Sequence, residues 1–212
     1  MKIEERVLSA LETGLKGDFV QALAHITPAI EASARKKLGK SKISREEYKA
    51  FLRGYHFVIE RFIGEGFDLD RSRFPKVTLK SEGGKEIADP DFADIIYHAF
   101  RCALAHGHEI DEEFAFIRSA RLGASRWLIG FEDGRVHMPD KVIWALVGVV
   151  VFCDANTEIE TETGMWLEWG TEDRRGGEPY RFDIDLFWGG EATVRNFFAK
   201  RPAVRVAFDP KD

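Results

Sequence analysis

The chain has 212 residues, of which 44% are hydrophobic and 12% aromatic, so it can bury a globular core. Its 31 Lys and Arg residues face 36 Asp and Glu residues, giving a formal net charge of −5 at pH 7. This balance excludes a nucleic-acid binder that uses its whole surface, but it permits a local basic groove. The longest apolar run, Val142 to Cys153, is too short to span a bilayer, and residues 1–15 lack a signal-peptide pattern. We therefore expect a cytoplasmic protein without membrane contact.

The two cysteines, Cys102 and Cys153, each fall inside a predicted helix. They form no close-spaced metal motif, so we expect buried thiols in a reducing compartment and no disulfide. Neither a GxxxxGK nor a GxGxxG phosphate loop occurs in the sequence. The sequence thus predicts neither a metal site nor a bound cofactor.

Helical periodicity dominates the first half of the chain. Apolar residues recur at three- and four-residue spacing over residues 3–15, 19–38 and 48–63, which predicts three helices. Pro28 is expected to kink the second helix or split it in two, and Ser44 with Glu47 forms a capping box for the third. Residues 67–88 contain proline and glycines around a short apolar alternation, which indicates a loop with at most a small strand or hairpin.

A fourth amphipathic helix is predicted from Pro90 to His106. Asp89 supplies an N-cap, Pro90 suits the first helical position, and Gly107 suits the left-handed residue after the helix. His106 then lies in the last turn, where the helix dipole favours its protonated form and Arg101 opposes it. A histidine balanced near neutrality is a usable proton donor or acceptor.

Arg101, four residues and His106 on a late helix of a helical chain resemble the signature of the HEPN superfamily. The resemblance implies a homodimer in which two such motifs meet and cleave RNA without a metal. It implies that Arg101 stabilises charge on the scissile phosphate and that His106 transfers a proton. It also implies a toxin or defence effector, with an antitoxin or another regulatory protein as a partner.

Four further residues are assigned to this site in supporting roles. Asp94, His98 and Cys102 precede His106 at successive four-residue steps, so they share one helix face, and His108 follows at once. One helix face cannot surround a metal ion alone, and no second cluster of Cys or His is evident. We expect Asp94 and His98 to face the same cleft as Arg101 and to orient it.

Other interpretations of these residues stay open. Arg101 can be an ordinary surface arginine and His106 a C-capping histidine, because residues five apart on an α-helix lie about 140° apart around its axis. Basic residues crowd segments 35–45 and 195–205, which fits solvated helix ends as well as a phosphate-binding patch. A HEPN-like dimeric binding or regulatory protein without catalysis is the alternative function. A small-molecule or nucleotide-binding protein that uses the aromatic C-terminal segments is a third.

The second half of the chain has more strand and turn patterns than the first. Residues 114–117 and 126–131, with a tight-turn signal over 132–135, predict a two- or three-stranded antiparallel meander. An almost wholly apolar stretch over about 140–156 favours a buried helix. Three short aromatic segments then follow, of which the second predicts a strand and the third a short helix: residues 165–169, 181–188 and 192–200.

These elements predict a mainly α protein with a helical bundle of the HEPN-like kind. The core spans residues 1–110, and a smaller antiparallel, β-containing C-terminal elaboration spans residues 111–212 and packs on it, which makes the fold α+β. We find no internal repeat, low-complexity tract or linker, so both parts are expected to form one continuous domain.

Overall fold

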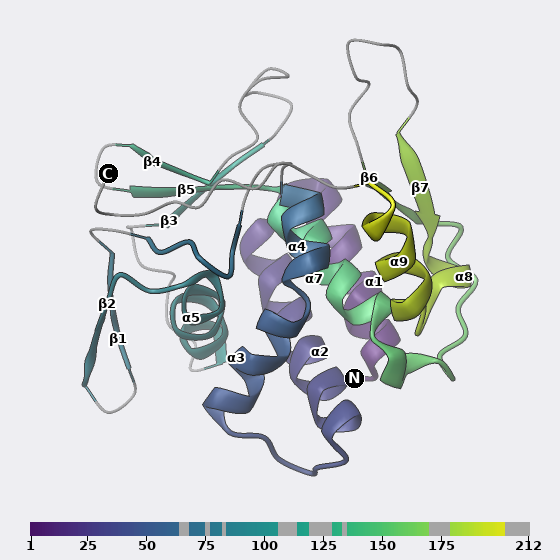
Figure 1. The fold of residues 1–212 in the computed structure, drawn as a ribbon, viewed down its shortest axis with the longest axis horizontal. Coiled ribbons are helices and arrows are strands. Elements are labelled where there is room, and N and C mark those ends of the chain that lie inside the picture. Colours follow the sequence, from purple (N-terminus) through teal and green to yellow (C-terminus); the bar gives the residue numbers. More distant parts are fainter. Residues whose placement is uncertain are drawn as a thin grey trace.

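The computed structural model confirms a mainly α fold with small β elements (Figure 1). It describes residues 1–63, 68–74, 77–81, 84–105, 114–118, 129–132, 135–169 and 179–201. Within these ranges the strands form two two-stranded sheets and one three-stranded sheet, all set around a core of helices. One hydrophobic core contains side chains from both halves of the chain.

The first two predicted helices are confirmed as α1 (Ile3–Lys16) and α2 (Phe19–Leu38). They are joined by a tight turn in which Gly17 adopts φ +84°, and Asp18 caps α2 by accepting the amide hydrogen of Gln21. Pro28 does not split α2, which runs through it as one helix. Ile26 and Ile30, on either side of Pro28, are both fully buried, so tertiary packing holds the two halves in line.

The third predicted helix is divided in the structure. The Ser44–Glu47 capping box is present and begins α3 (Arg45–Gly54), and α4 (His56–Ile63) follows after a break at Tyr55. The single helix expected over residues 48–63 was therefore wrong at this point. Gly54 has the weakest helix propensity of any residue but proline, and the break falls directly after it.

The loop before the fourth helix contains the expected hairpin, in which β1 (Thr78–Lys80) pairs with β2 (Glu86–Ala88). The helix itself begins two residues later than expected. Asp89 takes a left-handed conformation with φ +47°, and Asp91 is the N-cap in a reciprocal capping box with Asp94. Asp89 was therefore wrong as the cap, and Pro90 lies before the helix.

The three-stranded sheet consists of β3 (Phe114–Ile117), β4 (Gly130–Glu132) and β5 (Arg135–Pro139) in the order β3-β5-β4. β5 pairs antiparallel with β4 but parallel with β3, so the expected all-antiparallel meander was wrong for one pairing. Alternation of apolar residues predicts a strand but does not specify which neighbour it pairs with.

The predicted buried helix is confirmed as α7 (Lys141–Phe152), of which ten residues are buried. It crosses the middle of the molecule against α1, α2 and α4, and a 3-10 turn, η3 (Asp154–Asn156), follows it (Figure 1). The side-chain amide of Asn156 donates to Ser33 on α2 and to the carbonyl of Val150. These bonds fix the end of α7 to α2.

The C-terminal aromatic segments form a layer beside α7. β6 (Trp166–Trp169) pairs antiparallel with β7 (Tyr180–Asp183), and two short helices follow, α8 (Ile184–Phe187) and α9 (Glu191–Ala199). The strand expected over residues 181–188 is therefore shorter. The Asp183 carboxylate accepts the amide hydrogen of Asp185, which begins a helical turn in place of further strand.

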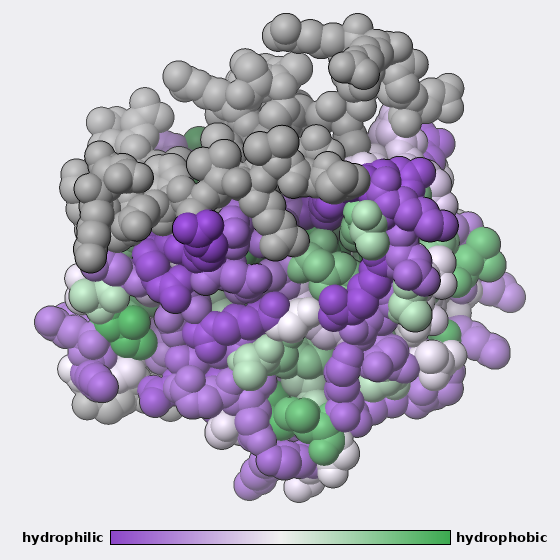
Figure 2. Space-filling model, viewed as in Figure 1, coloured by the Kyte–Doolittle hydropathy of each residue, from purple (hydrophilic) through white to green (hydrophobic). Residues whose placement is uncertain are grey.

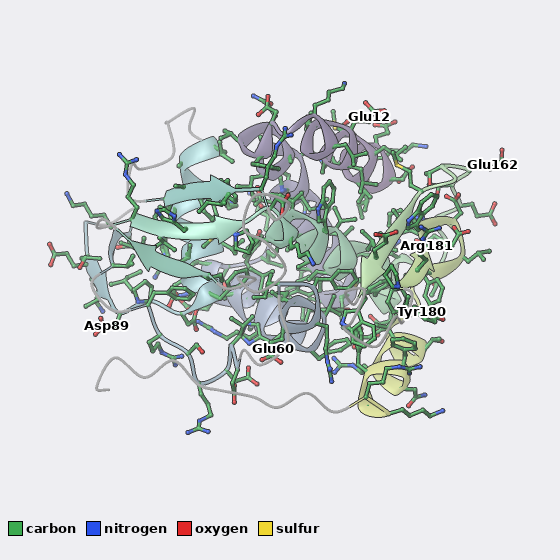
Figure 3. The ribbon with its side chains drawn as sticks, turned by 90° about the horizontal axis from the view of Figure 1, so that it is seen from above. Glu12, Glu60, Asp89, Glu162, Tyr180 and Arg181 are labelled. Atoms are coloured by element: carbon green, nitrogen blue, oxygen red, sulfur yellow. The ribbon has the colours of Figure 1, made fainter. Side chains whose placement is uncertain are left out.

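Hydrophilic side chains dominate the face of the molecule that Figure 2 shows, with separate small apolar areas between them. In Figure 3, Glu12 and Glu162 project outward at the periphery. In the part of the chain that the structure describes, none of the helices combines the length and apolar character needed to cross a membrane.

The close approach of α7 to α4 at Gly148 makes a testable prediction. A Cβ on Gly148 would lie 3.1 Å from a methyl of Val58 on α4 and 3.3 Å from the Phe152 ring. Gly148→Val should therefore overpack the core and lower the free energy of unfolding by about 1–3 kcal/mol, measured by urea denaturation. Gly54→Val is the matched control, because no atom lies within 4 Å of a Cβ there, and it should be close to neutral. Equal effects of the two changes would contradict this packing.

Candidate functional site

The residues of the predicted site lie on one helical segment with an unusual middle. Helix α5 (Phe92–Ile95) continues as a π-helix, η1 (Ile96–Cys102), and ends in α6 (Ala103–Ala105). Hydrogen bonds in a π-helix join residues five apart, and such segments occur frequently at functional sites. The π-helix ends at Cys102 and α6 follows it, so the departure from α-helical geometry lies mainly before Arg101.

Arg101 is held by a partner that the sequence did not indicate. Its Nη2 donates to Glu31 Oε2 of α2 at 2.9 Å, and its guanidinium lies 5.4 Å from the centre of the Tyr97 ring. Burial lowers the pKa of Arg101, but the hydrogen bond and charge of Glu31 outweigh it, so the net shift is upward. The two side chains are 25% and 26% exposed, which places a charged, oriented guanidinium at the protein surface.

Asp94 has partners of its own on α3. Its Oδ1 lies 3.0 Å from Lys49 Nζ and 3.8 Å from Arg53, and its backbone and carboxylate complete the capping box with Asp91. Burial raises the pKa of Asp94, but the hydrogen bond from Lys49 and the surrounding positive charges produce a net lowering. The structure therefore places Asp94 with Lys49 and Arg53, and the ion-pair partner of Arg101 is Glu31.

His98 is the least satisfied polar group of the segment. It is 7% exposed, and neither ring nitrogen has a hydrogen-bond partner among the described residues. Its ring meets Tyr97 edge-on at 4.9 Å, and burial, with the charge of Lys49, lowers its pKa. Burying a polar group without a partner costs stability, so His98 is held in place at the expense of unsatisfied ring nitrogens.

Three predicted site residues remain: Cys102, His106 and His108. Cys102 is a buried free thiol at the end of η1. His106 and His108 lie outside the described residues. Arg101, Asp94, His98 and Cys102 are therefore the members of the expected site that the structure describes, with Arg101 paired to Glu31 on α2 and Asp94 paired to Lys49 on α3.

The basic cluster over residues 35–45 is largely neutralised. Lys36 pairs with Glu158, Lys40 with Glu47, and Arg45 with Glu46. Lys37 pairs with Asp154 at 2.9 Å and Glu191 at 2.7 Å. The pairs of Lys36 and Lys37 join the end of α2 to segments that follow α7, and the other two are local. This neutralisation favours the solvated-end interpretation over a phosphate-binding patch.

An acidic group also forms where none was predicted. Oxygens of Glu60, Asp68 and Asp70 lie within 4.8 Å of one another. Glu60 accepts the amide hydrogen of Leu69, Asp68 accepts that of Arg71, and Asp70 bonds to the buried ring of His56 at 2.7 Å. These bonds give the three carboxylates a structural role in holding the segment that follows α4.

Comparison with known proteins places this fold in a family. A family model described as Rv1289 matches residues 2–212. The chain belongs to the Rv1289 family. It is 25% identical over 209 residues to "Uncharacterized protein Rv1289" of Mycobacterium tuberculosis (strain ATCC 25618 / H37Rv), covering 99% of this chain and 93% of that protein. "Uncharacterized protein Mb1320" of Mycobacterium bovis (strain ATCC BAA-935 / AF2122/97) has the same identity and coverage. No solved structure matches the chain.

Glu31 is the partner of Arg101 that sequence reasoning missed. It lies on α2, 70 positions before Arg101, in a helix whose other features are capping and burial. Only its position among the buried residues Ile30, Ser33 and Ala34 shows that it sits at the edge of the apolar face. The pattern of buried residues locates Glu31 on α2 but does not indicate that Arg101 is its partner.

The lowered pKa of His98 makes stability depend on pH in this Rv1289-family chain. The unfolded histidine binds a proton below about pH 6.5, where the folded one still resists it, so the free energy of unfolding should fall as pH drops from 7.5 to 5.5. His56, whose pKa burial also lowers, contributes in the same direction. His98→Phe should reduce this slope without lowering stability at pH 7.5, measured by urea denaturation at each pH. Coincident slopes for the two proteins would contradict the assignment.

Proposed function

We propose that this chain is a metal-independent endoribonuclease of the HEPN type that acts as a homodimer. The observation that carries the proposal is the placement of Arg101: a partly exposed guanidinium, oriented by Glu31 and Tyr97, on a π-helical segment that leads toward His106. Its biological role is that of a toxin or defence effector, with RNA as substrate and an antitoxin or regulatory protein as partner. The location is cytoplasmic.

The ion pair with Glu31 is compatible with phosphate binding. A guanidinium has five N–H donors, and Glu31 takes one of its nitrogens, Nη2. Because both side chains are partly exposed, the pair contributes only about 0–1 kcal/mol, so a phosphodiester can share or replace the carboxylate. Glu31 then serves to hold the guanidinium in position before RNA arrives.

The chemistry follows from the Arg101–His106 motif that resembles the HEPN signature. The ribose 2′-oxygen attacks the adjacent phosphorus, a new P–O2′ bond forms, and the P–O5′ bond breaks. Arg101 stabilises the additional charge on the phosphate, and His106 takes the 2′-hydroxyl proton or supplies one to the leaving 5′-oxygen. The products are a cyclic phosphate and a 5′-hydroxyl end.

A second function has its own support. The net charge of −5, the pairing of Arg101 with Glu31 and the neutralised cluster over residues 35–45 all reduce the attraction for RNA. They favour a HEPN-like dimeric binding or regulatory protein without catalysis.

The deciding experiment is cleavage of end-labelled, mixed-sequence RNA in the presence of EDTA. Wild type should leave cyclic phosphate ends, and Arg101→Ala and His106→Ala should each lower the rate by about 100-fold or more while staying folded and dimeric. Lys85→Ala, which removes an exposed charge from the β1–β2 hairpin, is the control and should cut at the wild-type rate. If the wild type and both site variants are equally inert on every RNA, or cut equally, catalysis at this motif is excluded.

Glu31→Gln separates the two functions further. It removes the carboxylate charge beside Arg101 while keeping the shape of the side chain, so RNA should bind several-fold more tightly to the variant. Affinity should also fall steeply with salt concentration for both proteins, because phosphate contacts release counterions. Weak binding that neither salt nor Glu31→Gln changes would support the non-catalytic protein.

A further inference from the structure

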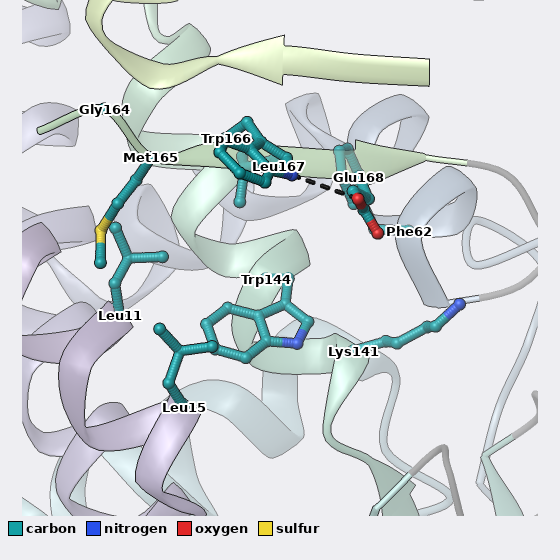
Figure 4. Close-up of a pocket in the computed structure, with 10 residues that line it drawn as sticks. All are labelled: Leu11, Leu15, Phe62, Lys141, Trp144, Gly164, Met165, Trp166, Leu167 and Glu168. Carbon is teal, nitrogen blue, oxygen red and sulfur yellow. Dashed lines mark hydrogen bonds between the residues drawn. The ribbon is translucent and has the colours of Figure 1, made fainter. Parts of the chain in front are cut away.

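A cavity of about 540 Å³ lies between α1, the start of α7 and strand β6 (Figure 4). This is within the range of small-molecule sites, which are mostly apolar with a few placed polar groups. Leu11 and Leu15 on α1 lie at one side of it, and Met165 on the approach to β6 lies beside them. None of its lining residues belongs to the site around Arg101.

The two residues of α7 that are not buried face this cavity. All residues of the helix are buried except Lys141 and Trp144, which are three apart and so share one face of the helix. Both line the cavity. A helix that is apolar on all other sides thus presents one aromatic and one cationic side chain to a space that no described side chain fills.

The polar groups of the cavity gather at one end. In Figure 4, Lys141 and Glu168 lie together at the side away from Leu11, and the indole nitrogen of Trp144 points toward that side. Glu168 already accepts from Trp166 Nε1 at 3.2 Å and from Arg181 Nε at 3.0 Å. Its Oε1 is therefore engaged, and Lys141 and Trp144 add donors at this end of the cavity.

The state of Lys141 agrees with an anionic partner. Burial lowers the pKa of Lys141, and the charges of Asp140 and Glu168 oppose that effect only in part. A desolvated ammonium gains more from a carboxylate than an ammonium in water does. The indole N–H of Trp144 adds a second donor at this end of the cavity.

We propose that this cavity binds a small amphipathic carboxylate, with its aromatic or aliphatic body between Trp144 and Trp166 and its carboxylate at Lys141. The two indoles and the aliphatic side chains of Leu11, Leu15 and Met165 supply the apolar contact area. Binding at this cavity does not depend on ribonuclease activity at Arg101.

The test uses 2-naphthoate and its uncharged counterpart 2-naphthalenemethanol as probes, followed by tryptophan fluorescence and by calorimetry on the full chain. Wild type should bind 2-naphthoate with at least about tenfold higher affinity than the alcohol, which is a difference of about 1.4 kcal/mol. Lys141→Met, which keeps an apolar stem of similar length, should remove this preference and leave binding of the alcohol unchanged.

A matched pair of surface variants locates the site. Leu15→Glu places a negative charge at the cavity, and Leu15 is 66% exposed, so the fold tolerates the change. It should weaken 2-naphthoate by about tenfold or more. Leu186→Glu makes the same change at a residue that is 79% exposed and does not line the cavity, and it should bind like the wild type.

Three results would overturn the proposal. Equal affinity for the two probes would show a plain apolar pocket without an anion site. Equal binding of 2-naphthoate to wild type, Lys141→Met and Leu15→Glu would place the probe elsewhere on the chain. A dimer that binds neither probe, and that Leu15→Glu dissociates, would show that a second copy covers this face.

Discussion

Helix α7 must be buried on every side but one, and the other elements are arranged to achieve this. Each buried Val, Ile, Leu or Phe along it contributes about 1.5–3 kcal/mol relative to exposure, so leaving one face in water would cost a large part of the stability of a domain. Helices α1, α2 and α4 cover it on one side, and the layer of β6, β7 and α9 covers the region around Phe152 and Phe182, whose rings lie 5.3 Å apart. The first and second halves of the chain therefore share one core.

Polar contacts then fix the positions that apolar packing leaves free. Lys37 lies between Glu191 and Asp154, and Tyr55 donates to Glu191, so one cluster joins the ends of α2, α4, α7 and α9. Burial raises the pKa of Glu191, but Lys37, Tyr55 and Arg195 together lower it to about 2, so it stays charged at any physiological pH. Asn156 and the Asp91–Asp94 capping box act in the same way at the end of α7 and the start of α5.

The two proposed sites occupy opposite kinds of environment. Around Arg101 the protein offers a partly exposed cation whose charge is shared with Glu31. Beside α7 it offers an apolar space with donors at one end. The first arrangement suits a large, solvated polyanion, and the second suits a small molecule that brings its own apolar surface.

The sequence by itself determined the local elements of this protein. Apolar periodicity and capping residues predicted α1, α2, the start of α3, the β1–β2 hairpin, α7 and α9, because those signals act within a few residues of each other. It also brought Arg101 and His98 to attention, since motif spacing is local as well. Only the tertiary structure decided the parallel pairing of β3 with β5 and the cavity at Lys141 and Trp144. It also decided that Arg101 pairs with Glu31 and Asp94 with Lys49. Each of these joins segments distant in sequence, and their pairing depends on how all helices pack around α7, which no local pattern encodes.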